Sequence, residues 1–336
     1  MLSKTLHIST SPHLQKDIST AAIMRNVVVA LLPVAGFAVY AFGWNALLVI
    51  LTAVLACVLT EHLLCRWSNK ASTITDWSAI ITGLLLGLSL PPAFPLWMTF
   101  FGGVIAIAVG KFAFGGLGYN VFNPALVGRA ILQAAFPVAI TTWYPSFSAD
   151  RFSHISSSVL AFPFMEPTVD AISGATPLAA FKFGGASTTL HDLALGLISG
   201  STGETCAIII LLGGLYLALR NMMNWRIPIA ILLTVFVFNG ALYLMDATTY
   251  PSPLFALFSG GLMLGAVFMA TDMVASPLTA KGVVVYGVFI GIMVVVIRTW
   301  GGLPEGVMYA ILLANAVSPH IDKLFQNRVY GTAKEK

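Results

Sequence analysis

Charged side chains are scarce in this sequence of 336 residues. Asp, Glu, Lys and Arg together make up 9% of it, whereas a soluble domain carries about 25%. This scarcity excludes an ordinary water-soluble globular protein. The net charge of +4 is too small to indicate nucleic-acid binding, and it fits basic residues placed in cytoplasmic loops between membrane spans.

Cysteine is also rare, with three in the chain. Cys57, Cys65 and Cys206 form no Cys-x-x-Cys pair, so we expect no zinc or iron–sulfur site carried by this chain alone. The six histidines show no spacing typical of metal or haem ligands. The first twenty residues, MLSKTLHISTSPHLQKDIST, lack the apolar segment of a cleavable signal peptide, and none is predicted.

Apolar residues dominate what is present, at 58% of the chain. Their runs repeatedly reach the roughly 20 residues that a helix needs to cross a bilayer. The sequence therefore predicts an all-α polytopic membrane protein of about ten transmembrane helices, several of them short or broken by Gly, Pro and polar residues. The predicted spans are Ile23–Phe42, Asn45–Leu64, Ser78–Leu90, Leu96–Phe114, Val121–Phe136, Glu204–Leu219, Ile227–Leu244, Pro253–Thr271, Gly282–Ile297 and Gly306–Val317.

Basic residues fix the expected orientation. With ten crossings and a cytoplasmic N-terminus, nearly all Lys and Arg residues that flank the spans fall on the cytoplasmic side, and Arg298 is the exception. Both termini are therefore expected in the cytoplasm of a multi-pass inner-membrane protein. The expected parts are an N-terminal segment (1–22), a first five-helix repeat (23–136), a large external or periplasmic loop (137–203), a second five-helix repeat (204–319) and a C-terminal tail (320–336).

The two halves resemble each other. GLLLG at 83–87 matches GLMLG at 261–265, and GGL at 115–117 matches GGL at 301–303. An odd number of spans in each half gives the halves opposite orientations, so five plus five predicts an inverted repeat. Such repeats place their sites near the membrane midplane, among broken helices.

The stretch DAISGATPLAAF, residues 170–181, stands in the long polar interval between the halves. Gly174 permits a sharp turn, while Thr176 followed by Pro177 is a typical helix start. A short helix ending near Gly184 is predicted, with the Thr176 hydroxyl at its N-terminus, where backbone N–H groups favour a negative group such as a phosphate. An ordinary N-cap is the simpler alternative.

The pattern Asp170-x-x-Ser173-Gly174-Ala175-Thr176 resembles the flavinylation motif of the NqrB/RnfD family. These proteins are membrane subunits of the sodium-pumping NADH:quinone reductase and of the Rnf ferredoxin:NAD oxidoreductase complex. The resemblance implies that a separate flavin transferase attaches FMN covalently to Thr176 through a phosphoester, and that the other four residues form its recognition sequence.

Three further stretches look like signatures of the same family: GYNVFNPALVGRA, FMATDMVASPLT and PEGVMYAILLANAVSP. The short N-terminal segment resembles RnfD more than NqrB. The resemblance implies an electron-carrying subunit of a redox-driven Na⁺ or H⁺ translocase, not catalytic alone, working with the other Rnf subunits between ferredoxin and NAD. Two alternatives stay open: the B subunit of the quinone reductase, and a channel or secondary transporter without a redox cofactor.

Polar residues inside the spans are the remaining candidates. Asn123, an expected N-cap, and Arg129 could hold a second, non-covalent flavin, since the family is associated with riboflavin, or Arg129 could be a structural clamp. Asp272 could be an ion-path carboxylate or the cap of a helix beginning near Pro277. Lys111 is expected to extend its ammonium to the membrane interface.

Overall fold

The computed structural model describes residues 19–70, 72–163, 175–185, 188–204 and 206–326. These residues form helices and connecting turns, without a β-strand in the described ranges. The first half holds α1 (Thr20–Phe42), α2 (Trp44–Trp67), α3 (Ser78–Ser89), α4 (Leu96–Ala108) and α5 (Pro124–Ala135), with short 3₁₀ turns η1 (Ile74–Asp76) and η2 (Phe112–Phe114). The intervening segment holds α6 (Pro137–Ile140), α7 (Pro177–Gly184) and α8 (Leu190–Leu195). The second half holds α9 (Ala207–Leu219), α10 (Arg226–Met245), α11 (Pro253–Phe258), α12 (Leu262–Leu264), the π-helical turn η3 (Gly265–Met269), α13 (Ala280–Trp300) and α14 (Val307–Leu324).

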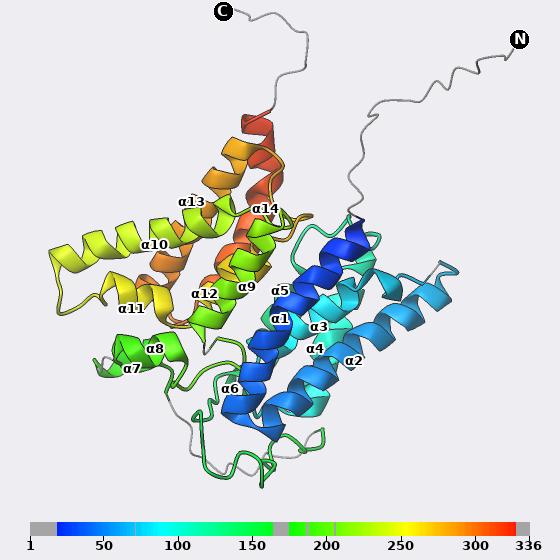
Figure 1. The fold of residues 1–336 in the computed structure, drawn as a ribbon, viewed down its shortest axis with the longest axis horizontal. Helices are drawn as coiled ribbons and strands as arrows, with labels where there is room; N and C mark the ends of the chain where they lie inside the picture. Colours follow the sequence, from blue (N-terminus) through cyan, green and yellow to red (C-terminus); the bar gives the residue numbers. More distant parts are fainter. Residues whose placement is uncertain (1–18, 71, 164–174, 186–187, 205, 327–336) are drawn as a thin grey trace, which may run out of the picture.

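This order confirms the predicted polytopic membrane architecture, because each predicted span coincides with a helix or a broken helix. In the described part of the chain, five helical segments are long and apolar enough to cross a bilayer, and α3 and α9 are shorter apolar helices. The start of α1 and the end of α14 lie at one end of the molecule, and α6, α7 and α8 lie at the other (Figure 1). Several boundaries differ by a few residues, and two differ more: α4 ends at Ala108, before the predicted Phe114, and α14 continues past Pro319 to Leu324.

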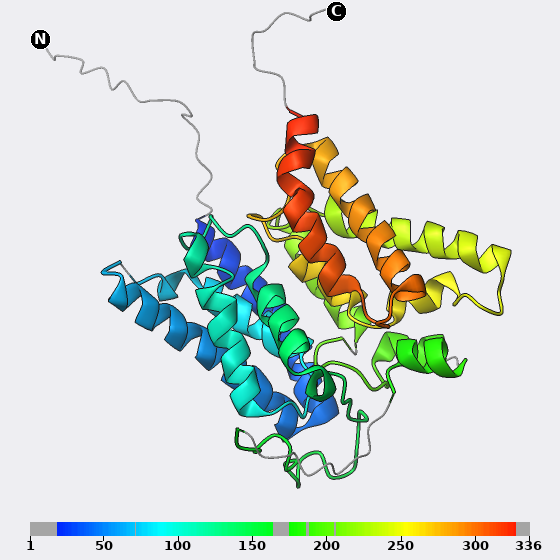
Figure 2. The ribbon, with the colours of Figure 1, turned by 180° about the vertical axis from the view of Figure 1, so that it is seen from behind.

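The two halves use the same internal packing. In the first half α2 packs along α3 and α4, and α4 packs on α5; in the second half α10 packs along α13, and α13 packs on α14. The halves lie side by side, with α1 against α9 between them (Figures 1 and 2). The two GLLLG-like stretches fall in α3 and across α12 with its flanking glycines; the inverted repeat itself stays a prediction.

The third span of each half is broken, and residues outside that span satisfy the freed backbone. Thr202 Oγ1 donates to the carbonyls of Gly87 at 2.7 Å and Leu90 at 2.6 Å, at the end of α3. Asn123 Nδ2 donates to the Met269 carbonyl at 3.1 Å, at the end of η3. Buried backbone groups without partners cost several kcal/mol each in a membrane interior, so these contacts allow the helices to stop there.

Glycine permits the closest helix contacts. A methyl group added at Gly83 of α3 would lie 2.5 Å from Val54 Cα and 2.9 Å from the Ala53 carbonyl oxygen on α2. Since both neighbours are backbone atoms, they cannot give way as a side chain could. At Gly36 of α1, by contrast, nothing lies within 4 Å of the added methyl.

We therefore expect Gly83→Ala to destabilise the protein by about 1–3 kcal/mol through overpacking. Gly36→Ala is the matched control, and it should be neutral or slightly stabilising because alanine is the better helix former. Thermal denaturation of both variants in detergent measures the difference. Equal melting temperatures for the two variants would contradict the close α2–α3 contact.

Candidate functional site

Thr176 begins α7 as the sequence predicts. Its Oγ1 accepts from the Ala179 N–H at 3.2 Å, Pro177 occupies the first helical position, and Gly185 ends the helix with φ +65°. The Thr176 residue is 3% exposed, and Ala175 is exposed. Asp170, Ser173 and Gly174 lie outside the described residues, so the geometry described is that of Ala175, Thr176 and the helix after them.

A lysine fastens α7 to the second half of the protein. Lys182 Nζ donates to the carbonyls of Arg298 at 2.8 Å, Gly301 at 2.5 Å and Leu303 at 3.4 Å, at the carboxyl end of α13. An ammonium there also interacts favourably with the helix dipole, although burial lowers the pKa of Lys182. Apolar contacts add to this attachment, through Leu178, Phe181, Leu193, Ile198, Phe255 and Phe258.

A cavity of about 380 Å³ opens beside Thr176; we name it the Thr176 cavity. Its volume falls in the range of about 300–1,000 Å³ that small-molecule sites occupy. Trp143 and Phe183 offer aromatic surface, and Arg129 offers a guanidinium group. The full lining is Arg129, Gln133, Ile140, Thr141, Trp143, Ala175, Thr176, Ala179, Phe183, Gly302, Leu303, Pro304 and Glu305.

Arg129 is held by two carboxylates from the second half of the sequence. Its Nη1 lies 3.4 Å from Glu204 Oε1 and its Nη2 lies 3.1 Å from Glu305 Oε2. The sequence predicts that Arg129 faces a cavity or clamps a neighbouring group, but it does not identify these two partners, because they are 75 and 176 residues away. The signal in the sequence was that both are acidic residues at the edges of apolar spans, where a buried arginine needs a negative partner.

Arg298, the one flanking basic residue that is not expected on the cytoplasmic side, has a structural role. Arg298 is a buried residue of α13, where Nη1 donates to the Ala256 carbonyl at 2.6 Å and Nη2 to the Ser259 carbonyl at 3.0 Å. Its guanidinium satisfies carbonyls where α11 ends and lies near Glu305 and Glu204. Arg298 therefore belongs to the helix break and is not a loop charge that sets topology.

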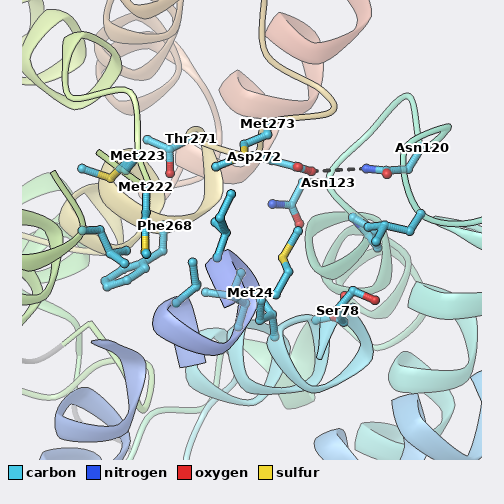
Figure 3. Close-up of a pocket in the computed structure, with 18 of the residues that line it drawn as sticks. Met24, Ser78, Asn120, Asn123, Met222, Met223, Phe268, Thr271, Asp272 and Met273 are labelled. Carbon is cyan, nitrogen blue, oxygen red and sulfur yellow. Dashed lines mark hydrogen bonds between the residues drawn. The ribbon is translucent and has the colours of Figure 1, made fainter. Parts of the chain in front are cut away.

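Asn123 and Asp272 line a second, smaller cavity of about 100 Å³, the Asp272 cavity (Figure 3). Asn120 Nδ2 donates to Asp272 Oδ2 at 3.2 Å. Asn123 Oδ1 caps α5, accepting from the Ala125 N–H at 3.0 Å, as predicted. In Figure 3 the two asparagines and Asp272 lie on one side of the cavity, opposite Met222, Met223 and Phe268.

This arrangement separates two residues that the sequence grouped. Asn123 lines the Asp272 cavity and Arg129 lines the Thr176 cavity, so one ligand in either cavity would not meet both. The alternative of Asp272 as a cap of the next helix is wrong. Thr279 caps α13, accepting from the Gly282 N–H at 3.1 Å, while Asp272 Oδ1 accepts from the Val274 N–H in the preceding turn.

The expectation that the Lys111 ammonium extends to the membrane interface is wrong. Lys111 is 4% exposed, and its Nζ lies 2.8 and 2.7 Å from the two oxygens of Glu61 and 2.6 Å from Ser78 Oγ. Lys111 and Ser78 also line the Asp272 cavity. A charged residue in an apolar span indicates that it needs a buried partner, but the sequence does not say that Lys111 and Glu61 are partners of each other.

Replacing Arg129 by Met should destabilise the protein by about 3–5 kcal/mol, since it leaves two buried carboxylates without their shared cation. The triple variant Arg129→Met, Glu204→Gln, Glu305→Gln should recover part of that loss. Chemical denaturation in detergent compares the two. A loss for Arg129→Met below about 1 kcal/mol, typical of exposed ion pairs, would contradict the buried cluster.

Comparisons with known proteins identify the family of the chain. Residues 7–331 match the sequence profile of the NQR2, RnfD, RnfE family. The chain is 43% identical to the D subunit of the proton-translocating ferredoxin:NAD⁺ oxidoreductase complex of Clostridium ljungdahlii, over 97% of this chain and 96% of that protein. It is 41% identical to the D subunit of the Na⁺-translocating ferredoxin:NAD⁺ oxidoreductase complex of Acetobacterium woodii, over 98% and 97%. It is also 41% identical to the D subunit of the ion-translocating oxidoreductase complex of Alcanivorax borkumensis, over 97% of each chain. The resemblance expected from the motifs is confirmed, and the chain belongs to the NQR2, RnfD, RnfE family.

Proposed function

We propose that this protein is the D subunit of an ion-translocating ferredoxin:NAD⁺ oxidoreductase complex and carries FMN covalently on Thr176. The observation that carries the flavin proposal is the Thr176 hydroxyl at the edge of a cavity that also holds the Arg129 guanidinium. The assignment within the family rests on three near full-length relatives that are named as D subunits. The B subunit of the quinone reductase and the transporter without a cofactor are less well supported.

The residues around Thr176 suit a flavin joined through a phosphoester. The N-terminus of α7 and Arg129 would balance the phosphate charge, and the ring faces of Trp143 and Phe183 would flank the isoalloxazine. FMN, when bound, supplies the electron-transfer chemistry. The chain's own part is to hold that group at a fixed place, which the Lys182 attachment of α7 does.

Attachment also requires access to the hydroxyl. Thr176 is almost fully buried once α7 is docked, and a threonine hydroxyl is a poor nucleophile without an activating base. A separate flavin transferase therefore acts before α7 packs against α13. Ala175, the last residue of the proposed recognition sequence, is exposed next to it.

The Asp272 cavity is the proposed place for a second, non-covalent flavin such as riboflavin. Its volume is below that of most small-molecule sites, so side chains must move to admit a ring. Four lining residues, Met24, Met222, Met223 and Met273, are methionines, whose unbranched side chains adapt most readily. Asn120, Asn123 and Asp272 would provide the polar contacts. Asp272 is also the proposed ion-path carboxylate.

The remaining assignments follow from the same family. The protein would lie in the inner membrane with both termini in the cytoplasm and α7 on the external side, so electrons would pass along the outer face. Partner proteins of the complex would bind ferredoxin and NAD. Redox steps in the assembled complex would drive Na⁺ or H⁺ across the bilayer.

The covalent flavin is tested by co-expressing the chain with a flavin transferase and recording flavin fluorescence of the denatured band in a gel. We expect a fluorescent wild-type band, a fluorescent Thr176→Ser band and a dark Thr176→Val band. Thr189→Val is the matched control, because Thr189 caps α8 in the same way, accepting from Asp192 N–H at 3.3 Å. A dark wild-type band with an active transferase would reject the proposal and favour the transporter.

The second flavin is tested by extracting non-covalent flavin from purified protein and measuring it chromatographically. Asn120→Leu removes a polar group of the Asp272 cavity and should weaken binding about tenfold or more, which is about 1.4 kcal/mol. Thr271→Val is the control, since the Thr271 hydroxyl in the same cavity already donates to the Val267 carbonyl. Equal flavin content in both variants would argue against this cavity, whatever the state of Thr176.

A further inference from the structure

The region behind Thr176 contains an unusual number of unsatisfied polar atoms. Within the described residues, every buried side-chain nitrogen or oxygen without a hydrogen-bond partner belongs to the neighbourhood of Arg129 and Arg298. Buried polar groups are normally paired, so this concentration in one place indicates hydrogen-bond partners that the protein atoms alone do not provide. The atoms are Arg129 Nε, Ser201 Oγ, Glu204 Oε2, Ser259 Oγ, Arg298 Nε and Glu305 Oε1.

Two small cavities lie among these atoms. One, of about 20 Å³, is bordered by Arg129, Glu204 and Glu305, together with Gly261 and Met269. The other, of about 10 Å³, is bordered by Thr176, Glu204, Gly260 and Glu305. A polar space of about 10–15 Å³ suffices for one water molecule. Each cavity therefore has room for about one water between the two carboxylates.

We propose that Glu204 and Glu305 form a buried proton-binding pair, which holds one proton between its carboxylates and exchanges it with solvent through the Thr176 cavity. Residues shared between neighbouring cavities mark the route. Glu204 is 5% exposed and lies innermost, the small cavity beside Thr176 joins it to Glu305, and Glu305 itself lines the Thr176 cavity. The proton comes from solvent and returns to it.

Hydrogen bonding explains why a proton is held. Each carboxylate receives one hydrogen bond from Arg129, at 3.4 and 3.1 Å, and keeps its second oxygen unpaired among the described residues. Two or three hydrogen bonds to a carboxylate stabilise its ionised form, and each of these carboxylates receives one. Burial, and then the like charge of Glu204, raise the pKa of Glu305, while Arg129 and Arg298 oppose that shift.

The surrounding charges favour a proton over a metal cation. Among the described residues, the charged groups that face the pair are the guanidinium groups of Arg129 from α5 and Arg298 from α13. The Lys182 ammonium on α7 is turned to the carbonyls at the end of α13. A metal cation would need several oxygen ligands beside two guanidinium groups, whereas a proton, although it carries the same charge, bonds to one carboxylate oxygen and needs no coordination shell.

The test records the infrared carbonyl band of protonated carboxylic acids on the full-length chain in lipid, with ¹³C-labelled glutamate to distinguish Glu from Asp. At pH 7 we expect a glutamic acid band. It should be lost in Glu305→Gln, and in Glu204→Gln its titration should move to lower pH, since the remaining acid then faces two arginines alone. Asp272→Asn, a buried acid elsewhere, should leave the band unchanged.

Absence of a glutamic acid band in the wild type between pH 5 and pH 8, or a band that survives in both variants, would overturn the proposal. Loss of the band when Na⁺ replaces choline at constant pH would also overturn it, because the pair would then be a cation site. Glu305→Asp keeps the carboxyl group and serves if a Gln variant fails to fold: it should retain a band with a shifted titration. The same spectra on Thr176→Val, which lacks the attachment oxygen, separate this proposal from the covalent flavin.

Discussion

Every backbone group inside a membrane needs a partner within the protein, and the rest of this structure depends on how that requirement is met at two broken helices. The carbonyls at the end of α3 accept from Thr202, in the segment that precedes α9. The last carbonyl of η3 accepts from Asn123, at the start of α5. The first half thus completes the broken helix of the second half, and the segment between the halves completes the end of α3, so neither half is expected to be stable alone.

The same contacts position the candidate site. Thr202 holds its segment against α3, and Glu204, two residues later, thereby comes within reach of Arg129 on α5. Arg298 satisfies carbonyls at the end of α11, and the turn after α13 then brings Glu305 to the other side of Arg129. A charged cluster therefore lies where the two halves meet, next to Thr176. It forms because the contacts that satisfy the backbone carbonyls at the helix ends also bring these charged residues together.

Local signals in the sequence predict the structure correctly. Helical spans follow from apolar run length, and the caps at Asn123 and Thr176 follow from an Asn or Thr before Pro, because both are decided within a few residues. Contacts between distant residues carry no such signal. Lys111 is paired with Glu61 across 50 residues, and no pattern in a single sequence says which acid meets which base. The π-helical turn η3 was likewise beyond prediction, since it depends on packing against α9, α10 and α14.

Helix α5 links the two cavities and fixes their separation. Its first residues border the Asp272 cavity, where Asn123 caps the helix, and Arg129 borders the Thr176 cavity. The rise between these residues, six positions at 1.5 Å each, is about 9 Å. Gly128 packs so closely that an added methyl would lie 2.8 Å from the Gly102 carbonyl oxygen on α4, which prevents α5 from sliding. Two sites on one short, tightly packed helix cannot move apart independently. Helix α5 is therefore the direct structural connection between the two cavities, and coupling between the proposed electron transfer near Thr176 and the polar groups near Asp272 would have this helix as its shortest path.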